Sequence, residues 1–198
     1  MSHLPVSRDL QAQETRKRLL NSVKELLSTT DYGKIRIADI AKRAGVSVGT
    51  VYLYFHSKSE MVMSLICERN EMLTSAYEVD QGESVIAQYT RYIDRYRDMI
   101  LRDGYHFSRG IQIAMIEESF SHQMTEVGLQ YEYLIQLIET GFATGELCRG
   151  SLSAEKFCEM FLCSINGVLV EWIYTNDDTQ VLVDGMENTK QLIRLLQA

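Results

Sequence analysis

Residues 34–58 contain two short apolar repeats separated by a glycine, and no other stretch constrains the fold as much. In each repeat, apolar residues recur at i, i+3, i+4 and i+7, which is the spacing of one face of a helix. The first repeat consists of Ile37, Ile40, Ala41 and Ala44, and the second of Val48, Val51, Tyr52 and Phe55. Helices of two turns are too short to be stable alone. We therefore expect them to pack on each other and on a third helix.

A sharp turn is predicted between the two helices. Gly45 stands where the first helix must end, and glycine enters the left-handed conformation there without a steric penalty. Ser47 then follows as an N-cap for the second helix. With its apolar repeat turned inward, the second helix is expected to present to solvent Gly49, Thr50, Leu53 and Tyr54. Such a face suits entry into a major groove of DNA.

The third helix is expected at residues 9–28, where leucines and a valine form an apolar stripe. It carries the basic triplet Arg16-Lys17-Arg18, which is placed to contact phosphates beside the groove. The alternative for this triplet is an ordinary solvated helical face.

These residues together resemble a known DNA-binding domain. Asp39-Ile40-Ala41-x-x-Ala44-Gly45-Val46-Ser47, followed by Gly49-Thr50-Val51-Tyr52-x-Tyr54-Phe55-x-x-Lys58, is similar to the motif of the tetracycline-repressor (TetR) family. The resemblance covers about residues 10–65 and implies a homodimeric, all-helical regulator of transcription, usually a repressor. It further implies a larger C-terminal domain that binds a small molecule and dimerises. By position it assigns DNA contacts to Ser47, Val48, Gly49, Thr50, Tyr52, Tyr54 and Lys58, with Tyr52 and Lys58 at phosphates.

The chain departs from the family pattern at two positions. Where the family often has a threonine that caps the first helix and contacts a phosphate, this chain has Ile35-Arg36-Ile37. We expect a charged contact from Arg36 in its place. Where the family often has proline before the glycine of the recognition helix, Val48 stands here. Valine can meet a thymine methyl group but offers no hydrogen bond.

Composition favours an all-α fold of two domains. The 198 residues include a single proline, Pro5, so few breakers interrupt helices. Residues 1–60 hold ten Lys and Arg against six Asp and Glu, whereas the remaining residues hold ten against twenty-one. A basic N-terminal part suits phosphate, and an acidic body keeps the protein soluble. We predict a three-helix helix-turn-helix domain at 1–58 and a ligand-binding and dimerisation domain at 59–198.

Further helices are expected at residues 59–77, 84–101, 106–117, 120–143 and 153–175. From 160 to 174 the chain is apolar almost all round, yet it is judged too short to cross a bilayer. We expect the helices at 120–143 and 153–175 to pair with their copies across a two-fold axis as a four-helix bundle. The alternative is a monomer with one core.

The effector site is predicted from aromatic and polar residues of the C-terminal part. A cavity lined by aromatic side chains with a few polar groups is typical of small-molecule recognition. The candidates are Tyr92, Tyr96, His106, Met124, Tyr131, Asn166 and Trp172. Taken singly, each is equally explained by packing or surface position. We predict an unknown small-molecule effector, no cofactor and no metal.

Other features bound the function. The chain lacks a phosphate-binding glycine loop, a nucleophile elbow and paired Cys-x-x-Cys, so we expect no enzyme. No run approaches the roughly twenty uninterrupted apolar residues of a membrane span, and no basic segment precedes an apolar one at the N-terminus, so we expect a cytoplasmic protein without a membrane partner. The four cysteines are expected to be buried, reduced thiols, with a thiol sensor as the alternative.

The sequence thus predicts a sequence-specific, dimeric repressor that a small-molecule effector releases from a palindromic operator in double-stranded DNA. The alternative is an effector-independent DNA-binding protein whose C-terminal domain recruits a protein partner or organises DNA.

Overall fold

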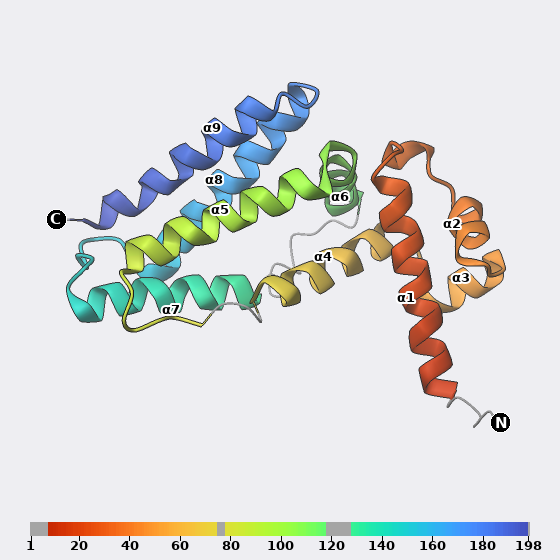
Figure 1. Cartoon of the computed structure of the whole chain (residues 1–198), viewed down its shortest axis with the longest axis horizontal. Helices are drawn as coiled ribbons and strands as arrows, with labels where there is room; N and C mark the ends of the chain where they lie inside the picture. Colours follow the sequence, from red (N-terminus) through yellow and green to blue (C-terminus); the bar gives the residue numbers. More distant parts are fainter. Residues whose placement is uncertain (1–7, 75–77, 118–127, 198) are drawn as a thin grey trace. The chain divides into compact units, whose positions relative to one another are not determined.

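The computed structural model describes residues 8–74, 78–117 and 128–197. Within these ranges all regular secondary structure is helical (Figure 1), which confirms the predicted fold class. The chain divides into two compact units: the first is Met1–Cys67 with His106–Phe120, and the second is Glu68–Tyr105 with Ser121–Ala198. The division at residue 58 stays a prediction of where the DNA-binding domain ends.

The first unit is built around a three-helix core. Its elements are α1 (Arg8–Leu27), the 3-10 turn η1 (Tyr32–Lys34), α2 (Ile37–Ala44), α3 (Val48–Tyr54), the start of α4 (Lys58–Thr74) and nearly all of α6 (Tyr105–Glu117). α2 packs against both α1 and α3, and Figure 1 shows α2 and α3 together on one side of α1. Apolar side chains from all these elements enclose one core, which includes Leu19, Val23, Ile40, Ala44, Val51, Phe55, Phe107 and Ile111.

The turn between α2 and α3 has the predicted geometry. Gly45 adopts φ 68° and ψ 36°, the left-handed conformation that ends α2. The Ser47 hydroxyl accepts a hydrogen bond from the Thr50 N–H at 3.0 Å and so caps α3. At the start of α2, the carboxylate of Asp39 accepts from the Arg36 N–H at 3.0 Å. Asp39 therefore supplies a cap from inside α2, where the family often uses a threonine before the helix.

The predicted inward face of α3 is wrong at two of its four positions. Val51 and Phe55 are fully or almost fully buried and Tyr54 packs partly against the same core, but Val48 is 41 % and Tyr52 51 % exposed. α3 has only seven residues, so it meets the core along one turn, at the i, i+3 and i+4 positions that begin at Val51. The spacing-based assignment extended the stripe one turn too far toward the N-terminus.

Among the described residues, the second unit consists of the end of α4 and a bundle of four further helices. They are α5 (Val85–Asp103), α7 (Gly128–Thr144), α8 (Ala154–Tyr174) and α9 (Thr179–Lys190), and α9 runs into the 3-10 helix η3 (Gln191–Leu196). α5 and α8 each pack against both α7 and α9 (Figure 1). Aromatic side chains fill the centre, where the Tyr89 ring lies 5.8 Å from that of Phe157 and 5.4 Å from that of Phe161. The sequence did not single out α9 as a helix of its own.

α8 corrects the expectation that its apolar segment is too short to cross a bilayer. It is 21 residues long with a hydropathy of 1.3, and by length and composition it is the one helix of the described residues able to cross a membrane, so it was wrong to judge it too short. The helix starts at Ala154, six residues before the stretch counted from the sequence. Core helices of soluble proteins pass the same test, and α8 buries one face in the bundle.

The cysteines are not uniformly buried, so the expectation of four buried thiols is wrong. Cys158 on α8 is buried, Cys67 is half-buried, and Cys148 and Cys163 are exposed. Burial raises the pKa of the Cys158 thiol to about 12, with a smaller contribution from the Glu155 carboxylate, so this thiol is unreactive at neutral pH.

Candidate nucleic-acid interface

The outward face of α3 is mainly apolar. Leu53 is 83 % exposed, and Val48, Gly49 and Tyr52 are exposed beside it. Val51, Tyr54 and Phe55 hold the helix on the core, and none of the outward side chains belongs to that core. Three of them were predicted DNA contacts, whereas Leu53 was expected to face outward but was not included among the contacts. The signal that identifies it is the register of the buried positions, which the tertiary structure supplies.

The polar residues at the start of α3 bond to each other. The Ser47 and Thr50 hydroxyl oxygens are 2.8 Å apart, and the Ser47 hydroxyl also caps the helix. Thr50 is half-buried, as is Tyr54, which turns toward the core. The predicted contacts at these positions therefore depend on side chains that are already partly engaged.

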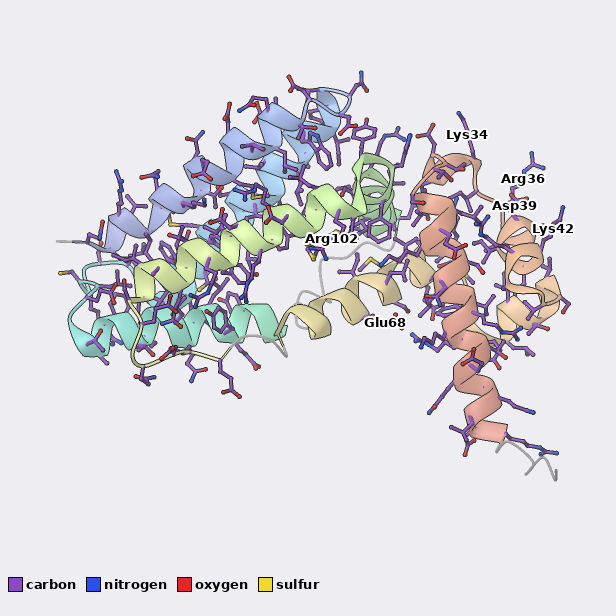
Figure 2. The ribbon with its side chains drawn as sticks, viewed as in Figure 1. Lys34, Arg36, Asp39, Lys42, Glu68 and Arg102 are labelled. Carbon is purple, nitrogen blue, oxygen red and sulfur yellow. The ribbon has the colours of Figure 1, made fainter. Side chains whose placement is uncertain are left out.

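Basic side chains stand beside α3. Arg36 and Lys42 are exposed, and neither forms an ion pair with another residue of the described ranges. Figure 2 shows Arg36, Asp39 and Lys42 projecting outward from α2. On α1, the Arg16 guanidinium lies 5.3 Å from the centre of the Phe55 ring, which anchors α1 to the end of α3. Arg36 and Lys42 supply positive charge where a phosphate backbone would pass.

Lys58 is held inside the unit. Its ammonium donates to the Tyr32 carbonyl at 2.6 Å and to the Ile35 carbonyl at 3.1 Å, and it lies 3.8 Å from the centre of the Tyr32 ring. Partial burial lowers the pKa of Lys58, against an opposing effect of the Glu117 carboxylate. In this position the cation closes the turn that precedes α2. Its predicted phosphate contact requires the ammonium to reach outward from these carbonyls and stays a prediction.

α6 is bound to the turn that follows α1. The His106 Nδ1 lies 3.2 Å and the Arg109 Nη1 3.4 Å from the same carboxylate oxygen of Asp31. The Tyr32 hydroxyl donates to the Glu117 carboxylate. His106 thus belongs to the first unit and pairs with Asp31, whereas the other described effector candidates belong to the second.

Four of those candidates, Tyr92, Tyr96, Tyr131 and Trp172, lie in or beside the core of the second unit. Tyr92 is buried, with its ring 6.4 Å from the Tyr96 ring. Trp172 is buried, meets Tyr105 edge to face at 5.8 Å, and has an indole N–H without an acceptor among the described residues. Tyr131 is half-buried and donates to the Glu155 carbonyl at 3.3 Å.

The remaining candidates are not part of this group. Asn166 is exposed on α8, and Met124 lies outside the described residues. A separate open hollow of about 410 Å³ lies between residues 80–85 and residues 140–146. None of the effector candidates lines it, and the Glu146 carboxylate beside it caps α5 by accepting from the Val85 N–H at 2.8 Å.

Known proteins match both the sequence and the fold. A family model described as bacterial regulatory proteins of the tetR family matches residues 19–65. The fatty acid metabolism regulator protein of Bacillus subtilis is 23 % identical over 184 residues, 86 % of this chain and 94 % of that protein. The transcriptional repressor KstR of Rhodococcus jostii is 31 % identical over 90 residues, 42 % of each chain.

The solved structures agree on the fold. FadR from Bacillus subtilis in complex with stearoyl-CoA superposes with a TM-score of 0.71 at 19 % identity, covering 89 % of this chain and 97 % of that one. These relatives are regulators and not enzymes, in line with the prediction from the sequence. With the helix-turn-helix geometry and these matches in agreement, the chain belongs to the TetR family of bacterial transcriptional regulators.

Proposed function

We propose that this regulator is a cytoplasmic, homodimeric repressor that leaves a palindromic operator when a small molecule binds its second unit. The observation that carries the DNA-binding part is the exposed face of α3 beside the unpaired cations Arg36 and Lys42. A recognition helix needs an outer face whose side chains are not buried in the protein core. Phosphate contacts then position that helix in the groove.

The exposed side of α8 supports a dimer. Small and apolar residues line it, including Met160, Cys163, Gly167, half-buried Val170 and Tyr174, which is 80 % exposed. α9 packs closely beside it, because a Cβ on Gly185 would lie 2.6 Å from a methyl carbon of Val168. α7 instead buries its apolar stripe within its own unit. We therefore propose that α8 and α9, in place of segment 120–143 and α8, form the four-helix contact, and that α8 does not span a membrane.

The buried indole N–H of Trp172 supports an effector site in the second unit. A buried donor without an acceptor costs free energy, and a ligand that supplies an acceptor removes that cost. The Bacillus subtilis relative was solved with stearoyl-CoA, which makes a long-chain acyl-CoA the first probe for this chain. The effector releases DNA only to the extent that it binds the released conformation more tightly than the DNA-bound one.

A specific observation also supports the effector-independent alternative. Tyr92 is packed among the rings of Tyr96, Tyr133 and Phe161, at 5.9 to 6.4 Å, so this part of the core is already filled by the chain itself. A filled core with the exposed α8 face suits a domain that binds a protein partner.

Selection of binding sites from random double-stranded DNA at physiological salt tests the proposal. We expect an enriched palindrome with half-sites one or more helical turns apart, bound by two copies of the chain. Binding that is only salt-sensitive, without enrichment, would instead support a DNA-organising role. Addition of stearoyl-CoA to the complex then tests acyl-CoA as an effector, with free CoA as the control. Retention of the DNA with every probe of a chemical library would favour the effector-independent alternative.

A further inference from the structure

We infer that α3 recognises its operator through thymine methyl groups, with Leu53 as the principal contact. This inference rests on the proposed operator binding and names the bases that α3 reads. Leu53 was not among the residues that the sequence assigned to DNA.

Leu53 is exposed to a degree that the fold does not require. Its side chain is 83 % exposed, while Val51 and Phe55 on either side of it are buried and hold the helix in place. A large apolar side chain at the surface gains stability only when a partner covers it. We take that partner to be the DNA groove into which the outward face of α3 fits.

The sequence of α3, Val48 to Tyr54, contains no arginine, lysine, asparagine, glutamine or acidic residue. Those are the side chains that form bidentate hydrogen bonds with guanine or adenine, or accept from cytosine. The Thr50 hydroxyl is half-buried and shares a hydrogen bond with Ser47. With the Tyr52 hydroxyl expected at a phosphate, discrimination between bases by the side chains of this helix then depends mainly on apolar contact. In the major groove, the methyl group of thymine is the apolar feature of the base edges.

Charge identifies the occupant as duplex DNA. Arg36 and Lys42 are exposed on α2 beside this face and have no ion-pair partner within the described ranges. Phosphates on either side of a major groove would meet these cations while Leu53 meets the bases between them.

The test uses the operator obtained by selection, with each thymine of one half-site replaced in turn by deoxyuridine. This change removes the methyl group and leaves the base pair intact. At one or more positions the wild-type protein should bind about fourfold more weakly, as expected when the burial of one methyl group is lost. Leu53→Ala should bind the thymine operator more weakly and show no further loss with uracil at that position. Leu195→Ala, which truncates another exposed leucine, should behave as the wild type.

A second substitution separates methyl contact from hydrogen bonding. At the Leu53-dependent position, a 5-methylcytosine·guanine pair should bind more tightly than a cytosine·guanine pair, because its methyl group occupies the same place in the groove. Leu53→Ala should bind the two equally. The Tm of Leu53→Ala should also equal that of the wild type, since the substitution removes no core contact.

Two results would overturn the inference: no position at which uracil weakens wild-type binding, or an equal uracil effect in wild type and Leu53→Ala. Neither result would contradict the selected palindrome, so the proposed function would still stand. Failure to select any operator would instead refute the proposed function itself.

Discussion

Replacement of Lys58 by methionine removes the cation that the structure places on two backbone carbonyls, yet keeps an unbranched side chain of similar length. The ammonium donates to Tyr32 at 2.6 Å and to Ile35 at 3.1 Å, and it lies over the Tyr32 ring. Each hydrogen bond from a charged donor is worth about 1.5 to 3 kcal/mol, and we take the lower part of that range because Lys58 is only half-buried. We expect a loss of about 2 to 3 kcal/mol in the free energy of unfolding.

Thermal unfolding followed by circular dichroism measures this loss. For a chain of this size it corresponds to a fall in Tm of about 5 to 10 °C. Lys24→Met, at an exposed lysine of α1, is the matched control and should change Tm little. The reasoning fails if Lys58→Met has the same Tm as the wild type while the dependence of operator affinity on salt concentration falls by about one unit of slope. Lys58 would then be a phosphate contact and not a structural cation.

Three further predictions concern other parts of the molecule. Gly45→Ala places a side chain at φ 68° and should cost about 1 to 2 kcal/mol in urea unfolding, whereas Gly150→Ala, at a glycine without positive φ, should cost less. Partial burial raises the pKa of Glu146, but hydrogen bonds from Ser84, Val85 and Ile86 outweigh it, so the folded pKa lies below 4.5. The carboxylate therefore stabilises the fold fully above pH 4.5 and loses that contribution as pH falls through the folded pKa. Glu146→Gln should be less stable than wild type at pH 7, and the difference in urea midpoint should shrink in acid; a constant difference would contradict this. Trp172→Phe removes an N–H that has no acceptor among the described residues, so any effector that uses this donor should bind more weakly by calorimetry. Unchanged affinity would remove Trp172 from the effector site.

Much of the first unit was predictable from the sequence, because local chemistry decides it. Gly45 ends α2 in the left-handed conformation, which favours glycine. The Ser47 hydroxyl caps α3 by a hydrogen bond within one turn. The apolar spacing of α2 likewise predicted Ile40, Ala41 and Ala44 as core residues, and all three are buried. Each of these features depends on residues that are at most a few positions apart.

The second unit was less predictable, because aromatic residues serve equally well in a core and in a ligand site. Tyr92 and Trp172 were interpreted as effector contacts, and the structure shows both packed against other rings. α9 was not recognised as a separate helix, although its packing against α5 and α8 closes the bundle. Composition alone does not say which neighbour a tyrosine meets.

By itself, the sequence determined the all-helical fold, the helix-turn-helix and the family, because helix periodicity, capping and turn residues act over short spacings. Only the tertiary structure decided which side chains of α3 face outward, since a seven-residue helix fits the same apolar pattern in more than one register. It also decided that Lys58 serves backbone carbonyls and that His106 pairs with Asp31. These contacts join residues 23 or more positions apart along the chain, and only the packing of the core brings such residues together.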